Sequence, residues 1–414
     1  MNKETPDLPL SPYRVLDLTN GKGYFCGKIL ADLGADVIKI EPPEGDPGRN
    51  IGPFYHDLPG KEKSLYFFAY NTNKRSITLN IETRDGQEIF KRLAKTADFV
   101  IESFDPGTMD KIGLDYSVLK GVNPRVIMVS ITPFGQDGPY KDWKASDIVA
   151  IAMGGLSHIT GSPDRPPARV SVDQAHVIVG AQGAMGAMIA HYYREATGKG
   201  QYVDTSTQES VVLSALTVPQ AWDLQKFIWP REGAYLSRAR KRVRHLWPCK
   251  DGYIAWRLFG GGLGVKTRAL VEWMESEGQA GELAEVNWQQ MDLLTVPSEK
   301  FYHWQELFGD FFKSHTKAEL CREALVRGIV LIPASTPKDL LADPQLEARD
   351  YWEEVDYPEL GTTITYPGAL YKSSEMNWEF RRAPLMGEHN SEIYEQELGF
   401  TKETLSRLKQ SGII

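Results

Sequence analysis

Short apolar runs alternate with amphipathic segments through the first third of the chain. Runs of strand length cover residues 14–19, 35–41, 76–81, 98–103 and 125–131, and helical patterns cover 24–33, 86–97 and 116–122. In the second helix Ile89, Phe90 and Leu93 share one face. This alternation predicts an α/β fold with a largely parallel, doubly wound sheet, and such sheets bind ligands beyond the carboxyl ends of their strands.

A glycine-rich apolar segment follows and predicts one long helix. Ser171 and Gln174 have the spacing of a capping box, and the apolar pattern runs to about residue 193 before Gly198. A glycine in a helix interior costs roughly 0.5–1 kcal/mol relative to alanine. We therefore expect another backbone or a ligand to come very close to the three interior glycines, Gly180, Gly183 and Gly186.

Two side chains that could take part in a reaction lie at the start of this helix. Asp173 and His176 are three residues apart and share a face, at the end where the helix dipole favours negative charge. They are the candidate reactive side chains of the chain.

The pattern changes after about residue 210. Tryptophans become frequent and the strand–helix alternation is lost, so we predict a separate, smaller domain over residues 223–335. The glycine-rich run 259–264 in this part lacks the Gly-Lys-Ser/Thr ending of a phosphate loop, which favours a turn or a flap.

Charge and cysteine content exclude several classes. A net charge of −8 argues against nucleic acid and anionic membrane surfaces as partners. Three scattered cysteines predict neither a disulfide framework nor a metal site, and they favour a reducing, cytoplasmic location. The apolar segment 177–190 is too short to span a membrane.

Several polar residues fall at or just past predicted strand ends, where a ligand is expected. Gly21, Gly23 and Gly27 approximate a dinucleotide-binding turn, although the spacing is wrong by one residue, and a simple chain reversal explains them equally well. The other candidates are Lys22, Pro42, Asn80, Ser103 and Phe104, with Lys111 and Lys144 further along the same loops. For each lysine a solvated surface charge is the alternative.

Motifs along nearly the whole chain, including GADVIKIEPP, TPFGQDGPY, ATGKGQYVDTS and APLMGEHN, resemble those of the class III CoA-transferases. The resemblance implies a Rossmann-like large domain made of residues 1–222 and a returning C-terminal segment, 336–414. It also implies a smaller inserted α+β domain over 223–335 and two chains interlocked as a dimer.

The resemblance places coenzyme A, as a thioester substrate and not a prosthetic group, on the large domain. Lysines of this domain could neutralise the phosphates of coenzyme A. The implied contacts are Gly21, Lys22, Pro42, Leu79, Asn80, Ser103, Phe104, Lys111, Ile112 and Lys144.

One departure from the family pattern concerns the nucleophile. Members that transfer CoA carry an aspartate four residues before a helix glycine and 25 before the Gln of the TGKGQ turn, and counting from Gly180 and Gln201 gives His176. The carboxylate is needed to form an anhydride and then an aspartyl thioester, which an imidazole cannot form. The racemase branch uses a His at the position of Ser146 and an Asp at that of His176, so this pair is also absent.

Four hypotheses follow. The first is a non-nucleophilic subunit that pairs with a homologous, aspartate-bearing chain and moves CoA from an acyl-CoA such as succinyl-CoA to an acid such as benzylsuccinate. The second is a stand-alone acyl-CoA isomerase, lyase or racemase-like enzyme with His176 as acid/base. The alternative role for His176 is structural, as a capped, hydrogen-bonded histidine of the core. In the third Asp173 replaces the nucleophile, although it lies nearly one turn away, and the fourth is a CoA-binding scaffold without a catalytic partner.

Overall fold

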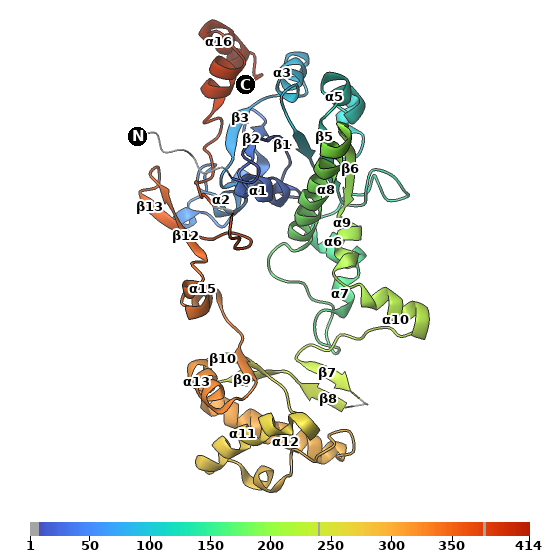
Figure 1. The fold of residues 1–414 in the computed structure, drawn as a ribbon, viewed down its shortest axis with the longest axis vertical. Coiled ribbons are helices and arrows are strands. Elements are labelled where there is room, and N and C mark those ends of the chain that lie inside the picture. The colour runs from blue at the N-terminus through green and yellow to red at the C-terminus, as the bar shows by residue number, and fades with distance from the viewer. Residues whose placement is uncertain (1–7, 239–240, 376–377) are drawn as a thin grey trace. The chain divides into compact units, whose positions relative to one another are not determined.

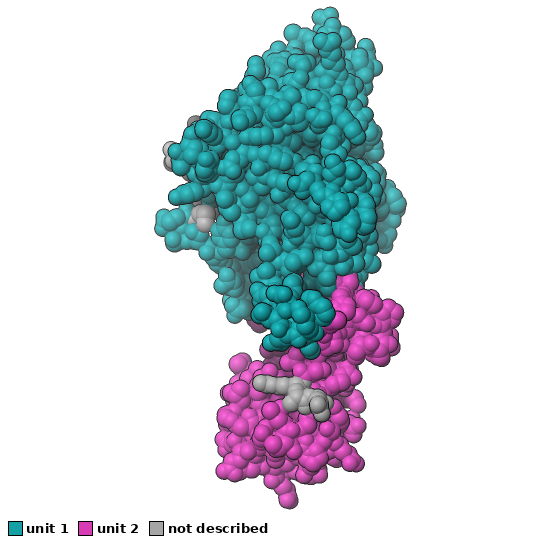
Figure 2. Space-filling model, turned by 90° about the vertical axis from the view of Figure 1, so that its right-hand side faces the viewer, with its two compact units in different colours: residues 1–156, 169–227, 345–414 teal, residues 157–168, 228–344 magenta. Residues whose placement is uncertain are grey.

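The computed structural model describes residues 8–238, 241–375 and 378–414. The chain forms two compact units, one of residues 1–156, 169–227 and 345–414 and one of residues 157–168 and 228–344 (Figure 2). The predicted domain boundaries after residues 222 and 335, and the interlocked dimer, stay predictions.

Six parallel strands form the sheet of the first unit, in the order β3-β2-β1-β4-β5-β6 (Figure 1). The predicted parallel, doubly wound α/β sheet is thereby confirmed. The order reverses between β1 and β4, which is where such sheets bind ligands. The strands are β1 (Arg14–Leu18), β2 (Asp36–Glu41), β3 (Arg75–Thr78), β4 (Phe99–Glu102), β5 (Ile127–Thr132) and β6 (Tyr202–Ser206).

Helices cover both faces of this sheet because alternate strand residues point to opposite sides. Val15 and Val37 belong to the core under α1 (Tyr24–Asp32) and α8 (Ala175–Thr197). On the other face, Leu16 and Ile38 share a core with helices α3 (Arg84–Ala94), α5 (Tyr116–Val122) and α16 (Lys402–Gln410). The sheet is therefore the middle layer of three.

Helix α8 packs so closely against α1 that no side chain fits at Gly180. A Cβ on Gly180 would lie 3.0 Å from the backbone nitrogen of Cys26 and 2.8 Å from Cβ of Phe25. The expected close approach of another backbone is confirmed at Gly180, where the backbone is that of α1, whereas Gly183 and Gly186 face the side chains of Ile131 and Val203. At its C-terminus the helix ends on Gly198, whose φ of 72° suits glycine.

The predicted capping box at the start of α8 is wrong. Gln174 is the N-cap residue and its side chain makes no capping hydrogen bond. Instead, the carboxylate of Asp147 accepts the backbone N–H groups of Gln174 and Ala175, at 2.8 and 2.7 Å. A residue 28 positions earlier therefore caps this helix, which local spacing could not reveal.

Shorter helices connect these elements. Helix α2 follows Ser64, whose hydroxyl accepts the N–H of Phe67 as an N-cap. The remaining helices of the first unit are α2 (Leu65–Asn71), α4 (Thr108–Lys111), α6 (Asp147–Met153), α9 (Thr207–Leu213), α10 (Thr217–Gln225) and α15 (Pro344–Ala348, whose first residue lies in the second unit). Within the described ranges, none of the helices has both the length and the apolar composition of a membrane span.

The second unit has its own aromatic core. Its antiparallel sheet, in the order β11-β10-β9, packs with helices around Trp247, Trp256, Trp288 and Trp304, all nearly inaccessible to solvent. The strands are β9 (Leu246–Cys249), β10 (Gly252–Trp256) and β11 (Leu331–Pro333), beside the hairpin β7 (Tyr235–Arg238) and β8 (Lys241–Arg244). The helices are α7 (Leu156–Ile159, whose first residue lies in the first unit), α11 (Gly264–Ser276), α12 (Ser298–Ser314), α13 (Lys317–Arg327) and α14 (Pro337–Leu341).

The C-terminal segment returns to the first unit and lies along β3. A hairpin, β12 (Trp352–Tyr357) and β13 (Thr362–Pro367), precedes it. His389 donates its backbone N–H to the carbonyl of Ser76 at 2.9 Å, and the hydroxyl of Tyr394 donates to the carbonyl of Thr78 at 2.7 Å. The edge strand β3 is thus covered by the end of the chain.

Candidate functional site

A pocket of about 300 Å³ opens at the carboxyl ends of the central strands. It lies next to the point where the strand order reverses, as expected of a doubly wound sheet. Four of the predicted CoA contacts line it: Pro42, Leu79, Asn80 and Phe104. Asn20, which the sequence did not single out, also lines this pocket.

Asn20 joins three further predicted residues to the pocket. Its backbone N–H donates to the Ser103 hydroxyl at 2.9 Å, and its side-chain oxygen accepts the backbone N–H of Lys22 at 3.1 Å. Gly21 lies between them, and a Cβ there would be 2.8 Å from the Tyr66 hydroxyl. The glycine turn is therefore held between β4 and α2.

The other predicted contacts lie outside the pocket lining. Lys111 is exposed at the end of α4, and Ile112 packs against the core beside α3 and α5. Lys144 is largely exposed and forms an ion pair with Asp105. Whether these residues, with Lys22, contact phosphates stays a prediction.

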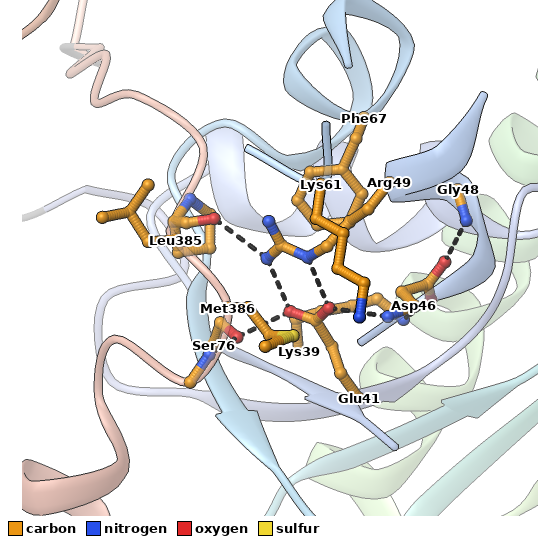
Figure 3. Close-up of polar contacts among 12 residues, drawn as sticks. Lys39, Glu41, Asp46, Gly48, Arg49, Lys61, Phe67, Ser76, Leu385 and Met386 are labelled. Atoms are coloured by element: carbon orange, nitrogen blue, oxygen red, sulfur yellow. Dashed lines mark hydrogen bonds and ion pairs between the residues drawn. The ribbon is translucent and has the colours of Figure 1, made fainter. Parts of the chain in front are cut away.

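A buried charge network, missed by the sequence analysis, builds one wall of the pocket. Lys39 forms an ion pair with Asp46 at 2.9 Å, and Arg49 makes two bonds to Glu41, at 2.6 and 2.7 Å (Figure 3). Burial alone would lower the pKa of Lys39, but the carboxylates of Asp46, Asp17 and Glu41 outweigh it and raise that pKa. These cations hold the 42–50 loop and are already paired, so they are not free for phosphates.

Glu102, at the end of β4, is a second feature that the sequence did not reveal. It lies in a polar recess of about 220 Å³ with Ser130 and Tyr202. Burial raises the pKa of Glu102 to about 7, although the backbone N–H of Phe104 donates to it at 2.7 Å. A carboxyl group that titrates near neutrality beside a ligand pocket is a candidate functional group.

The start of α8 brings together the candidate reactive side chains. His176 Nδ1 lies 3.3 Å from Asp173 Oδ2, with the histidine side chain 17% and the aspartate 35% exposed. This imidazole nitrogen is buried and, within the part of the chain that the structure describes, makes no hydrogen bond. Asp147 completes a triangle whose ligand atoms lie within 4.8 Å of one another, a spacing that could hold a metal ion. However, one oxygen of Asp147 already caps α8.

Aromatic side chains lie close to this helix start. The rings of Tyr66 and Tyr70 on α2 are 5.1 Å apart, and Phe25 is 6.4 Å from Tyr70. Burial and then the charge of Asp173 raise the pKa of both tyrosines, which places them near that carboxylate. Phe25 also touches Gly180, one turn beyond His176. This aromatic group was not predicted, because the pattern of residues 65–71 did not indicate a helix.

The arrangement supports acid/base chemistry better than nucleophilic attack by His176. An imidazole paired with a carboxylate can move a proton. At this position no oxygen nucleophile is present. One oxygen of Asp147 caps α8, and Asp173 lies 3.3 Å from the imidazole without a hydrogen bond to it.

Comparisons with known proteins agree with the fold and the motifs. A model of the CoA-transferase family III matches residues 10–390. The chain is 35% identical to succinyl-CoA:(R)-benzylsuccinate CoA-transferase subunit BbsE of Thauera aromatica, over 98% of both chains. It is 31% identical to succinyl-CoA–L-malate CoA-transferase beta subunit of Chloroflexus aurantiacus, over the whole of both chains.

A solved structure shows the same fold. The crystal structure of a CAIB/BAIF family protein from Brucella suis superposes with a TM-score of 0.82 at 29% identity, covering 94% of this chain and 99% of that one. The resemblance seen in the sequence motifs is confirmed. The chain belongs to the CoA-transferase family III and is a transferase of that family.

Proposed function

We propose that this chain is the non-nucleophilic subunit of a heteromeric class III CoA-transferase. It pairs, in an interlocked cytoplasmic dimer, with a homologous subunit that carries the catalytic aspartate. The observation that supports this most is His176, an imidazole at the position of the family nucleophile. A chain without that oxygen nucleophile needs a second polypeptide to form the aspartyl thioester.

The proposed reaction moves CoA from succinyl-CoA to an aryl-substituted acid such as benzylsuccinate. Relatives named for succinyl-CoA, including the benzylsuccinate and L-malate enzymes, support the donor. The rings of Phe25, Tyr66 and Tyr70, of which Phe25 packs against Gly180 of α8, support an acceptor with a phenyl group, because aromatic rings pack favourably on one another. Degradation of aromatic compounds is the metabolic setting that such an acceptor implies.

The test is reconstitution with a homologous chain that carries aspartate at the position of His176. The isolated chain should transfer no CoA, and the mixture should be active. Hydroxylamine or borohydride should trap a thioester on the partner only. Transfer by the isolated chain, with an adduct on one of its own side chains, would contradict the proposal.

A second candidate function rests on the contact between His176 and Asp173. At 3.3 Å the carboxylate can orient the imidazole as a general base for isomerisation, elimination or racemisation of an acyl-CoA. In D₂O the isolated chain would then exchange the α-hydrogen of an acyl-CoA. His176→Ala should abolish this exchange, whereas no exchange in the unaltered chain eliminates this function.

A further inference from the structure

The second unit contains a pocket of about 390 Å³ that none of the proposed chemistry uses. This volume is within the range of about 300–1,000 Å³ typical of small-molecule sites. Its lining is mainly apolar, with Val243, Leu258 and Phe301 inside and the exposed side chains of Leu236, Leu263 and Leu294 also contributing. The pocket lies wholly within this unit, beside the glycine-rich run at 259–261.

Two potential hydrogen-bond donors lie together at one part of the wall. His245 precedes β9 and Arg257 follows β10, and these strands are antiparallel neighbours, with the N–H of Trp256 donating to the carbonyl of His245 at 2.9 Å. Both side chains line the pocket. Both residues therefore lie at the same end of the strand pair and face one pocket.

Neither donor has an acidic partner. His245 Nε2 is buried and makes no hydrogen bond to any described residue. The guanidinium of Arg257 stacks 4.5 Å from the ring centre of Phe259, and it forms no ion pair with a described carboxylate. A planar guanidinium without a partner beside an unsatisfied imidazole is suited to a carboxylate.

The other charged groups nearby are already engaged. Lys241 donates to the carbonyls of Leu293 and Leu294, at 2.7 and 3.0 Å. Asp292 lines the pocket, but one of its oxygens accepts the N–H of Leu294 at 2.9 Å. Glu232, which lies close enough to affect His245, accepts the N–H of Ser237 at 2.7 Å. Arg257 and His245 are therefore the groups left to recognise a ligand.

The geometry points to a binding site in the second unit for a carboxylic acid with a compact apolar body, its carboxylate on Arg257 and His245 and its body among Val243, Leu258 and Phe301. Burying a carboxylate requires such donors, and the apolar lining provides the remaining binding energy. This site shares no lining residue with the pocket at the strand ends, and it does not depend on the proposed transferase role.

Calorimetric titration of the full-length protein with phenylbutyrate tests this site, with phenylbutanol as the uncharged match. We expect phenylbutyrate to bind with a Kd of about 1 mM or tighter and phenylbutanol to bind at least tenfold more weakly, as the loss of a charged hydrogen bond predicts. Equal binding of acid and alcohol, or no binding of the acid, would overturn the proposal.

Variants locate the binding. Arg257→Gln should weaken the binding of phenylbutyrate roughly tenfold or more. Arg322→Gln, at an exposed arginine on α13 of the same unit, should leave the affinity unchanged. Full affinity in Arg257→Gln places the acid elsewhere and refutes the site. Circular dichroism of each variant checks that it is folded.

Discussion

The carboxylate of Asp147, on the first turn of α6, accepts the backbone N–H of Ala175, the first residue of α8, at 2.7 Å. It bonds the N–H of Gln174 in the same way and so fixes the helix start that carries Asp173 and His176. The candidate reactive pair therefore depends on a residue outside its own helix.

Asp147→Ala should lower the free energy of unfolding by about 1–2 kcal/mol, as the loss of a helix cap does. Urea unfolding measures this change. Ser146→Ala is the matched control, because the Ser146 side chain makes no capping hydrogen bond, and it should stay within about 0.5 kcal/mol of the unaltered protein. Equal stability of both variants would show that Asp147 does not cap α8.

Gly180→Ala should destabilise the protein, and Gly121→Ala should stabilise it. A Cβ at Gly180 meets the backbone of α1 at 3.0 Å, where neither helix can yield cheaply. At Gly121, in α5, a Cβ meets nothing within 4 Å, so alanine gains about 0.5–1 kcal/mol of helix preference. Thermal unfolding of both variants should shift the midpoint in opposite directions. A shift of the same sign would contradict the close helix contact.

Glu102→Gln should remove a pH dependence of stability. Burial raises the pKa of Glu102 to about 7, so the folded protein binds this proton more tightly than the unfolded chain, in which the pKa is about 4.3. The resulting stability is complete below the unfolded pKa and is lost as the pH rises through 7. Between pH 5 and pH 8 the unaltered protein should lose about 2–3 kcal/mol more than the variant.

Urea unfolding at the two pH values measures the effect of Glu102→Gln. Glu88→Gln, an exposed position on α3 with the same chemical change, should keep the pH profile of the unaltered protein. A parallel profile in Glu102→Gln would mean that Glu102 ionises as a solvated carboxyl does.

Lys22→Gln should weaken the binding of CoA roughly tenfold and leave the binding of pantetheine unchanged, because only CoA carries the phosphates that a lysine would bind. Isothermal titration with both ligands separates the two contributions. Lys91→Gln, at a partly exposed lysine on α3, should change neither affinity. Equal losses for CoA and pantetheine would place Lys22 away from the phosphates.

Five of the six strands could be predicted from local pattern because they are apolar runs bounded by turn residues, whereas β6, YVDTS, is not such a run. Helix α2 could not, since its sequence LYFFAYN is aromatic and its helical state depends on the Ser64 cap and on packing of Phe67 and Phe68. Lys39 and Glu41 look like polar positions of a strand, yet both are buried because Asp46 and Arg49 fold back on them.

The site was predictable where family motifs fix single positions and not where distant segments meet. His176 stood out by counting along the chain, but its neighbours Tyr66 and Tyr70 lie over 100 residues earlier. His245 and Arg257 come to one pocket because β9 and β10 are antiparallel neighbours, a strand pairing that the apolar pattern did not specify.

Arg49 donates to the carbonyl of Pro384 at 3.0 Å, and the residues after Pro384 lie along β3. The wall of the pocket at the strand ends and the outer strand of the sheet are therefore both completed by residues more than 300 positions further along the chain. Without that segment β3 would present open backbone groups, which invite pairing with other chains. Displacement of this segment should therefore cause self-association and opening of the pocket together.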